Sequence, residues 1–263
     1  MQLPDYHVHT RFSDGEGEPR AYVERALQLG LTELGFTDHF SPPSLAGVSY
    51  GIATGGMDDY IEAVRTTAAA YPELPVLLGV EVDYLPEAAD ETLATIASYS
   101  FDYALCSVHF ADGFHFVERR NEKAEGWHDV NHVWRRYYET LIEAARTGAF
   151  DVVAHLDLPK LWGYRATDDL SGLEQDALGA IAAAGLAIEI NTSGADRRPV
   201  GEMYPAPDLL ARARLAGIPF TFGSDAHSVG RLASSFAQAT TLARSAGYDS
   251  YLRLSDRRLV TLP

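Results

Sequence analysis

The sequence predicts an α/β fold, a distorted (β/α)7 barrel of the TIM-like kind with a metal site at the carboxyl ends of its strands. Short apolar runs alternate with segments of helical period in seven successive units, which favours a parallel sheet. Seven units are one fewer than usual, so we expect the barrel to be distorted. No linker rich in Pro, Gly or Ser interrupts the pattern, and residues 1–263 are expected to form a single domain.

The expected strands are short runs rich in Val, Ile, Leu, Phe and Tyr. In chain order they cover residues 4–9, 32–36, 75–80, 103–108, 151–154, 186–190 and 218–222. The expected helices follow these strands and cover residues 19–29, 57–71, 87–98, 130–147, 170–184, 207–216 and 232–246. Pro19 stands in the first turn of the first helix, and Gly30 and Gly185 follow the ends of two helices, where these residue types are common. Two longer connections lie at residues 40–56 and 111–125.

The first strand carries two histidines at alternate positions. Successive side chains of a strand point to opposite faces, so His7 and His9 share one face. Buried together, they would need a partner such as a divalent metal ion, which neutral imidazole commonly binds. This pair alone is equally compatible with ordinary surface or core histidines, and only the rest of the chain can decide between the two interpretations.

Metal-binding residue types recur at or just after the end of nearly every expected strand. They are His7, His9, His39, Glu81, His109, His155, Asn191, Asp225 and His227, with Asp14 in the first loop. In an open doubly wound sheet these residues would be spread along an edge. In a barrel the carboxyl ends of the strands surround one pocket. The pattern therefore favours a closed or nearly closed barrel with these side chains around its mouth.

This set contains more ligands than one ion can use, which predicts two or three divalent ions. Zinc, manganese and iron all accept such ligands. Adjacent divalent ions are suited to hold a phosphate and to stabilise the attacking and leaving oxygens of its transfer. Six of the nine histidines belong to the set, and the other three, His115, His128 and His132, are expected to be ordinary loop or helix residues.

The overall charge limits the partners. The 21 basic and 37 acidic residues give a formal charge of −16, which opposes binding to nucleic acid. There is no run of about 18 apolar residues, and no basic segment leads into an apolar one near residue 1, so we expect a cytoplasmic protein without membrane contact. The single cysteine, Cys106, is expected to be a small core residue. The oligomeric state stays open.

Seven short motifs along the chain resemble those of the polymerase-and-histidinol-phosphatase (PHP) superfamily, and among its members those of the histidinol-phosphatase family. The motifs are His7-Val8-His9, Thr37-Asp38-His39, Gly79-Val80-Glu81, Ser107-Val108-His109, Ala154-His155, Asn191-Thr192-Ser193-Gly194 and Gly223-Ser224-Asp225-Ala226-His227. They cover nearly the whole chain in the order that the family has. The resemblance implies a PHP-type metal-dependent phosphatase domain over residues 1–263.

The resemblance also implies three cation positions. The first would be held by His7, His9, Glu81 and Asp225. The second would be held by Glu81, His109 and His155. The third would be held by Asp14, His39 and His227. Glu81 would bridge two ions, and Asp225 or His227 would be the catalytic group that transfers a proton.

The activity that the resemblance implies is hydrolysis of L-histidinol phosphate to L-histidinol and phosphate, a reaction of histidine biosynthesis, through a metal-activated hydroxide. One alternative is a PHP phosphoesterase that acts on another small phosphate ester or on a nucleotide. A second alternative, from a different class, is a noncatalytic metal-binding module. The small-molecule ester is favoured over a polynucleotide by the acidic charge.

An anionic substrate requires positive side chains near the metal ligands. Lys160, Arg197 and Arg198 lie in loops after expected strands and are predicted to bind the substrate phosphate. Arg119 and Arg120 are further candidates. For each of these cations taken alone, a solvated surface charge is an equal alternative.

Overall fold

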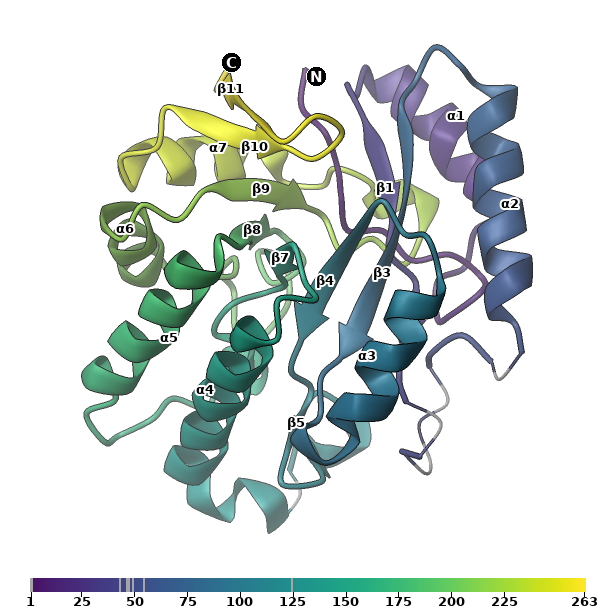
Figure 1. Ribbon diagram of the computed structural model, residues 1–263. Helices are drawn as coiled ribbons and strands as arrows, with labels where there is room; N and C mark the ends of the chain where they lie inside the picture. The colour runs from purple at the N-terminus through teal and green to yellow at the C-terminus, as the bar shows by residue number, and fades with distance from the viewer. Residues whose placement is uncertain (1, 43, 46–47, 49, 54, 124) are drawn as a thin grey trace.

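The computed structural model describes residues 2–42, 44–45, 48, 50–53, 55–123 and 125–263. A curled parallel sheet forms its centre, and helices cover the outside of the sheet (Figure 1). In spatial order the strands are β1 (Leu34–Phe36), β3 (Val76–Asp83), β4 (Tyr103–Ser107), β7 (Val152–Val153), β8 (Ala187–Asn191) and β9 (Phe220–Gly223), and β2 (His39–Phe40) also pairs with β3. The predicted parallel α/β architecture is confirmed. Part of the expected connection at residues 40–56 lies outside the described residues.

Residues 5–9 complete the barrel by lying between its first and last strands. Asp5 forms a parallel bridge with Leu34 beside β1, and Val8 forms one with Ala226 just after β9. A regular strand was expected at residues 4–9, but the segment makes only these isolated bridges. Its backbone divides its hydrogen bonds between two neighbours and forms a full ladder with neither. The predicted distortion of the barrel is located at this closure.

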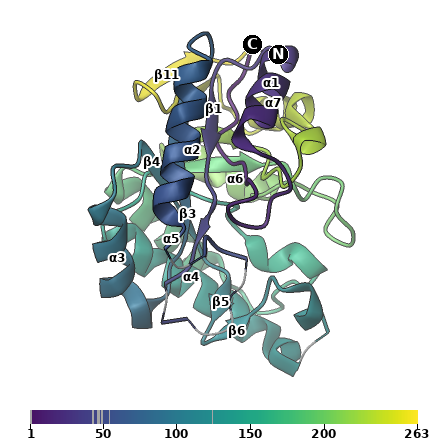
Figure 2. The ribbon, with the colours of Figure 1, turned by 90° about the vertical axis from the view of Figure 1, so that its right-hand side faces the viewer.

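The helices follow the strands in the expected order. They are α1 (Pro19–Leu29), α2 (Met57–Ala70), α3 (Ala89–Ser98), α4 (Val130–Arg146), α5 (Ser171–Ala184), α6 (Pro207–Leu215) and α7 (Phe236–Ser245). The last helix was expected from residue 232 and begins later, because Ala233 and Ser235 have φ angles of 52° and 61° that a right-handed helix does not contain. Seen from the side, α1 and α2 lie along one flank of the barrel (Figure 2).

A hairpin near the end of the chain closes the barrel at the end opposite the carboxyl ends of the strands. It consists of β10 (Ser250–Arg253) and β11 (Arg258–Thr261), which pair antiparallel, and the sequence did not predict it. Below it, the hydroxyl of Tyr6 donates to Glu33 Oε2 at 2.6 Å and accepts from the backbone N–H of Leu254 at 3.1 Å. Both chain termini lie at this end (Figure 1).

A second, shorter hairpin follows β4. Its strands are β5 (Phe110–Ala111) and β6 (Phe114–His115), at the start of the expected connection at residues 111–125. This hairpin and the short helical turn that follows it form one wall of the pocket at the mouth of the barrel.

Residues along each central strand alternate between two apolar clusters. On β4, Tyr103 and Leu105 belong to a small cluster inside the barrel, whereas Ala104 and Cys106 belong to the large cluster beneath the helices. Cys106 is a free, buried thiol, which confirms its expected place in the core. Among the described residues, no helix combines the length and apolar character that a membrane crossing requires.

Candidate metal centre

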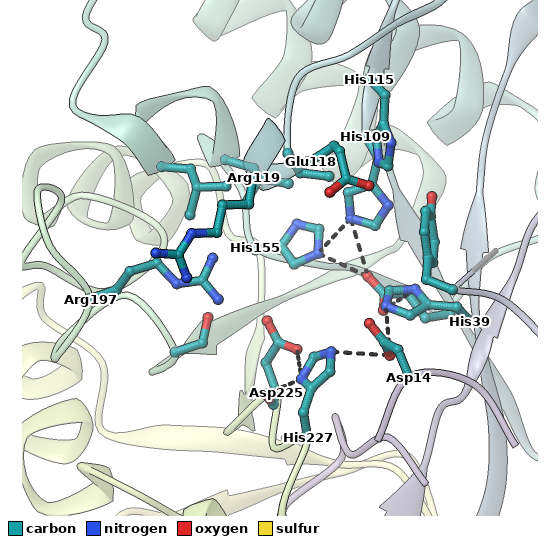
Figure 3. A pocket seen from close by; sticks show the side chains of 16 residues that line it. Asp14, His39, His109, His115, Glu118, Arg119, His155, Arg197, Asp225 and His227 are labelled. Atoms are coloured by element: carbon teal, nitrogen blue, oxygen red, sulfur yellow. Dashed lines mark hydrogen bonds and ion pairs between the residues drawn. The ribbon is translucent and has the colours of Figure 1, made fainter. Parts of the chain in front are cut away.

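The metal-binding residue types gather at the carboxyl ends of the strands, around one cavity (Figure 3). His7 and His9 lie on the same face of their segment, as the alternation predicted, and their ring centroids are 4.9 Å apart. Both side chains are fully buried. The sequence positions them on the closing segment, and the bridge from Val8 to Ala226 holds this segment beside the loop that carries Asp225 and His227.

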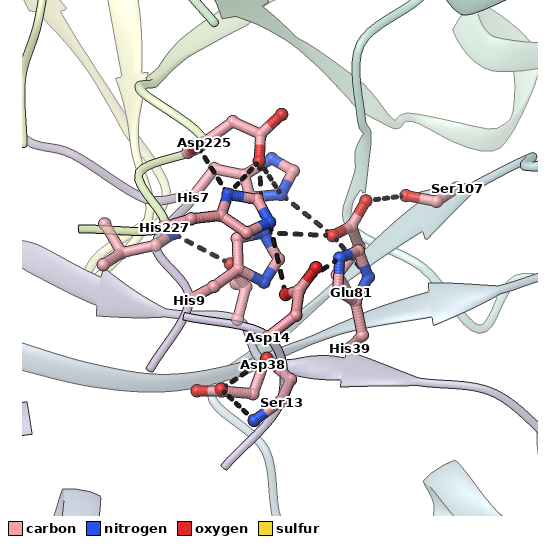
Figure 4. Close-up of polar contacts among 12 residues, drawn as sticks. His7, His9, Ser13, Asp14, Asp38, His39, Glu81, Ser107, Asp225 and His227 are labelled. Carbon is pink, nitrogen blue, oxygen red and sulfur yellow. Dashed lines mark hydrogen bonds and ion pairs between the residues drawn. The ribbon is translucent and has the colours of Figure 1, made fainter. Parts of the chain in front are cut away.

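The first group consists of His7, His9, Glu81 and Asp225. The Nε2 atom of His7 lies 3.0 Å from Glu81 Oε2, and the Nε2 atom of His9 lies 3.3 Å from the same oxygen. His9 Nε2 is also 3.2 Å from Asp225 Oδ1. Four side chains from three distant parts of the chain therefore direct nitrogen and oxygen atoms toward one point (Figure 4).

The second group shares Glu81 with the first. Its other members are His109, which follows β4, and His155, which follows β7. His155 Nε2 lies 2.8 Å from Glu81 Oε1 and 3.4 Å from His109 Nε2. Since the two carboxylate oxygens of Glu81 face different groups, this side chain is placed to bridge them.

The third group lies on the other side of Glu81. His227 Nε2 is 3.2 Å and His39 Nε2 is 3.7 Å from Asp14 Oδ1. His39 Nδ1 is also 3.0 Å from Glu81 Oε2, so this group adjoins the first. The structure thus brings together all nine residues that the resemblance implied as ligands, although the groups overlap: His9 also lies with Asp14, His39 and His227, and His39 lies with Glu81 and His109. The division into three sets stays a prediction.

The donor set fits divalent cations. Neither ring nitrogen of His9 has a hydrogen-bond partner among the residues that the structure describes, although the side chain is fully buried. An unpaired buried polar group costs about 1–3 kcal/mol, which makes this arrangement unfavourable for the protein alone. A cation shared by His9 Nε2 and the nearby carboxylates would remove this cost, and imidazole with carboxylate is the ligand combination that zinc, manganese and iron accept.

The carboxylates of the site are held in the ionised form that binds cations. Burial alone would raise the pKa of Glu81, but the charges of His39 and His7 outweigh it and hold the pKa well below its usual range. Burial is likewise outweighed at Asp225, where the charge of His7 keeps the pKa well below normal. These directions show a carboxylate cluster that positive charge stabilises.

The histidines differ in their preferred charge. Burial lowers the pKa of His9 to about 3, and the neighbouring charges of His227 and His39 act in the same direction. Burial opposes protonation of His39 too, but Glu81 and Asp14 outweigh it and raise its pKa to about 10. His9 is therefore kept as the neutral imidazole that metals bind, and a bound cation would take the place of the protons on its neighbours.

Of the four arginines that were candidates for binding the substrate phosphate, two line the cavity and two do not. Arg197 and Arg119 line the cavity, and Figure 3 shows both on the side of His155. Arg198 and Arg120 are exposed and are not among the cavity-lining residues that the structure describes. The loop position alone could not separate these neighbours.

The expectation for Lys160 has to be corrected. Its side chain is fully buried and does not line the described cavity wall. The ammonium group donates to Asp157 Oδ2 at 2.9 Å and to the carbonyl of Met203 at 2.7 Å, and it lies over the ring of Tyr204. Lys160 therefore ties two loops together behind the site, because its charge is already paired there.

The remaining three histidines divide between the cavity wall and the surface. His115 lines the cavity and stacks on Phe110 with ring centroids 4.3 Å apart. His132 pairs with Asp112 at 2.7 Å, and His128 is exposed. The expectation of ordinary loop or helix residues agrees with the positions of His128 and His132, whereas His115 belongs to the pocket.

Sequence reasoning missed three buried carboxylates that hold the ligands in place. Glu189 accepts from His7 Nδ1, and Asp83 accepts from His109 Nδ1 at 2.5 Å. Asp38 accepts from the backbone N–H groups at the start of the loop that carries Asp14. Asp83 could have been found, because it lies two residues after Glu81 on the same face of β3.

This fold and this cluster match a known class of proteins. The family model described as the PHP domain matches residues 5–193. The chain belongs to the PHP domain family, as the motifs predicted.

Similarity over the full length places it more narrowly. The chain is 37% identical over 252 residues to the probable histidinol-phosphatase of Deinococcus radiodurans, covering 93% of this chain and 94% of that one. It is 29% identical to the histidinol-phosphatase of Bacillus subtilis, covering 88% and 95%. Within the PHP domain family, the chain therefore belongs to the histidinol-phosphatase family.

A solved structure supports the fold. The histidinol phosphate phosphatase of Lactococcus lactis, crystallised with zinc, L-histidinol and phosphate, superposes with a TM-score of 0.82 at 24% identity, covering 99% of both chains. A protein of Listeria monocytogenes named as a putative histidinol phosphatase gives a TM-score of 0.80 at 20% identity, covering 89% of this chain and 99% of that one. The barrel assignment is confirmed by these likenesses.

Proposed function

We propose that this protein hydrolyses L-histidinol phosphate to L-histidinol and phosphate with two or three divalent cations. The observation that carries this proposal is the clustering of nine imidazole and carboxylate side chains, seven of which line one cavity whose wall also contains Arg119 and Arg197. The relatives from D. radiodurans and B. subtilis bear the name histidinol-phosphatase, and the L. lactis enzyme holds zinc, L-histidinol and phosphate. These names support the choice of substrate.

The three groups of side chains would hold the cations, with Glu81 between them. Cations bound there would supply positive charge for the phosphate oxygens and lower the pKa of water. The carboxylates contribute by remaining ionised, because their pKa values are held below the usual range. The protein therefore offers an acidic ligand cluster on an acidic chain, which is compatible with an anionic substrate only when the cations are in place.

The substrate phosphate would also be bound by Arg197 and Arg119. A guanidinium can donate two parallel hydrogen bonds to phosphate oxygens, and such charge-assisted bonds are stronger than neutral ones. Both side chains reach the cavity from outside the ligand cluster. They would orient the ester so that its phosphorus faces the ligand cluster and its amino alcohol faces the outer wall of the cavity.

Asp225 is the residue that we propose for proton transfer. Both Asp225 and Glu81 line the cavity, but the side chain of Asp225 is 15% exposed and that of Glu81 only 1%. The carboxylate of Asp225 is thus the more accessible acceptor, and it would take a proton from the water that attacks phosphorus and return it to the leaving alcohol oxygen. His227 lies 3.5 Å from Asp225 Oδ1 and would assist by holding this carboxylate.

The test is an assay of phosphate release by the metal-loaded protein with L-histidinol phosphate, other amino-alcohol phosphates and nucleotides. We expect the highest kcat/KM with L-histidinol phosphate. Release only from another ester would reject the substrate but keep the phosphoesterase, and no release from any ester by protein that binds metal would support the noncatalytic module. We further propose that residues 1–263 act as one domain in the cytoplasm, in line with a biosynthetic reaction and a free cysteine.

A further inference from the structure

Glu189 lies inside the barrel on β8 and is almost completely buried, with 1% of its surface exposed. Both of its carboxylate oxygens are 2.9 Å from Nδ1 of His7. One of them, Oε1, also accepts from the backbone N–H of His155 at 2.8 Å and from Asn191 Nδ2 at 2.8 Å. Glu189 is not among the described residues that line the cavity of the metal centre, and it belongs to none of the three ligand groups.

The contact between Glu189 and His7 determines which ring nitrogen of His7 can face a cation. A carboxylate only accepts hydrogen bonds, so Nδ1 of His7 must carry a proton and donate it to Glu189. The other nitrogen, Nε2, points to Glu81 Oε2 at 3.0 Å, within the first ligand group. Because Glu81 is also a carboxylate, Nε2 would exchange its proton for a cation at this position, while Nδ1 keeps its proton for Glu189.

We propose that Glu189 is a positioning residue that accepts the hydrogen bond of His7 Nδ1, holds the ring with Nε2 toward Glu81, and so controls the filling of the first cation position. This inference rests on the proposed metal centre, and it does not depend on the identity of the substrate. The distinctive feature of Glu189 is the kind of donor that it faces. The backbone N–H of His155 can only donate, and Asn191 keeps its NH2 group toward Glu189 because its Oδ1 accepts from the backbone N–H of Ser193 at 3.0 Å, so Oε1 must remain an oxygen.

An isosteric change at this position therefore has one permitted orientation. In Glu189→Gln the amide oxygen would take the Oε1 position and stay within reach of His7 Nδ1, and the NH2 group would take the Oε2 position at the same distance from Nδ1. The NH2 group donates, so it would oppose the proton on Nδ1 and replace a charged acceptor with a neutral one. The form of His7 with its proton on Nε2, which cannot bind a cation there, would become more favourable.

Asp83 provides a matched comparison because it plays a similar part for His109. Its Oδ1 accepts from His109 Nδ1 at 2.5 Å, but its Oδ2 accepts only from hydroxyl groups, those of Tyr50 at 2.5 Å and of Ser41. A hydroxyl can accept as well as donate. In Asp83→Asn the NH2 group can therefore face the hydroxyls while the oxygen still accepts from His109, and metal binding should survive.

Gly223 on β9 supports the same contact from the opposite side. A Cβ atom at this position would lie 2.1 Å from Glu189 Oε2 and 2.8 Å from His7 Cβ. Such distances are too short for any side chain, so the absence of a Cβ allows Glu189 and His7 to meet. Gly223→Ala should displace the carboxylate without removing its charge, and it gives a second, independent way to disturb the contact.

The experiment is a zinc titration in metal-buffered solution with bound zinc measured by elemental analysis. The variants are Glu189→Gln, Gly223→Ala and Asp83→Asn, with Glu33→Gln as the control for a buried Glu→Gln change. Glu33 is 4% exposed and binds the hydroxyls of Tyr6 and Ser255 at the other end of the barrel. We expect Glu189→Gln and Gly223→Ala to need about 10- to 100-fold more free zinc to fill one position, the usual cost of losing such a partner.

Glu33→Gln should load zinc at the same free concentration as the unchanged protein, and Asp83→Asn, which keeps an oxygen opposite His109, should lose less affinity than Glu189→Gln. Equal loading of Glu189→Gln and the unchanged protein would overturn the proposal, and so would an equally large loss in Glu33→Gln, because the loss would then follow from neutralising any buried carboxylate. If unchanged protein loads zinc but does not hydrolyse L-histidinol phosphate, the proposed function fails while this titration still decides the role of Glu189.

A second measurement covers the case in which Glu189→Gln does not fold. Nitrogen-15 spectra of the histidine rings of the unchanged, zinc-loaded protein show which nitrogen of His7 carries the proton. A proton on Nδ1 with zinc on Nε2 is expected. Zinc on Nδ1 would overturn the proposal without any variant.

Discussion

The two ends of the barrel bury polar groups in opposite ways. At the end closed by the β10–β11 hairpin, the hydroxyl of Tyr6 is bonded to Glu33 and Leu254, and the hydroxyl of Tyr103 donates to the carbonyl of Tyr6 at 2.7 Å. At the carboxyl ends of the strands, both ring nitrogens of the fully buried His9 lack a hydrogen-bond partner in the described part of the chain.

This difference shows how one fold separates stability from function. Buried polar groups that satisfy one another strengthen a core, whereas buried groups that lack partners cost free energy unless a ligand supplies what is missing. The hairpin end therefore stabilises the barrel by itself. The metal end is completed by cations, and its stability should depend on them.

The largest effect is expected from Glu81→Ala, which removes the side chain that the first two ligand groups share and that His39 of the third group contacts. Loss of one electrostatic group at an active site often costs 10²–10³-fold in kcat, and we expect at least about 10³-fold here because several cations depend on Glu81. Bound metal, measured by elemental analysis, should fall as well. If Glu81→Ala kept its full metal content and activity, the metal end would not depend on this ligand, and the proposed difference between the two ends of the barrel would be wrong.

Lys160→Met should have the next largest effect, on stability. Lys160 lies near the metal end of the barrel. Like the polar groups at the hairpin end, however, it already has a buried protein partner, which is Asp157. Removing one member of a buried ion pair costs about 3–5 kcal/mol, because the other charge is left unpaired. Urea unfolding would measure this loss. A normal unfolding free energy with a raised KM would instead restore Lys160 as a phosphate ligand.

Removal of the metal with a chelator should lower stability to a smaller extent. A ligand present at 100 times its dissociation constant stabilises the folded state by about 2.7 kcal/mol, and this contribution disappears with the ligand. Calorimetry of metal-loaded and chelator-treated protein would measure the change. The same treatment should destabilise Glu33→Gln by an equal amount, since that residue lies at the end that needs no cation.

Arg197→Ala and Arg198→Ala form a matched pair for the metal end. Both side chains are exposed, but Arg197 lines the described cavity and Arg198 does not. We expect Arg197→Ala to lower kcat/KM by about 10- to 100-fold, as the loss of a charge-assisted bond to phosphate does, with metal content unchanged. Arg198→Ala should behave as the unchanged enzyme. Equal losses in both variants would point to the general charge of the loop.

Tyr6→Phe should have the smallest effect and should act only at the hairpin end. It removes the hydroxyl that donates to Glu33 Oε2, a bond whose net contribution is about 1 kcal/mol. Thermal unfolding should detect this decrease, while zinc loading and kcat stay constant. A loss of metal in this variant would show that the two ends are coupled.

Much of the ligand cluster was predictable because barrel geometry turns positions along the chain into positions in space. Residues at the ends of successive strands had to meet once the sheet curled, and His39, His109 and His155 do so. Lys160 shows the limit of this reasoning. Its loop was placed correctly, but the direction of its side chain depends on Asp157 and on the carbonyl of Met203, which no local pattern reveals.

Other features depend on contacts between remote segments. Glu189 stands in an apolar strand, and only its contact with His7, 182 positions away, shows its purpose. The β10–β11 hairpin was missed for a similar reason. Tyr251 and Leu254 become buried when the hairpin covers the end of the barrel, so its stability comes from tertiary packing more than from its own turn.

The closing segment at residues 5–9 sets the order in which a newly made chain can finish its site. The bridge between Val8 and Ala226 joins a residue that is synthesised early to one that is synthesised late. At about 5–20 residues per second, His7 and His9 emerge from the ribosome roughly 10 s or more before Asp225 and His227 exist. A nascent chain therefore offers cations only a partial set of donors, and the complete centre forms after translation has passed β9.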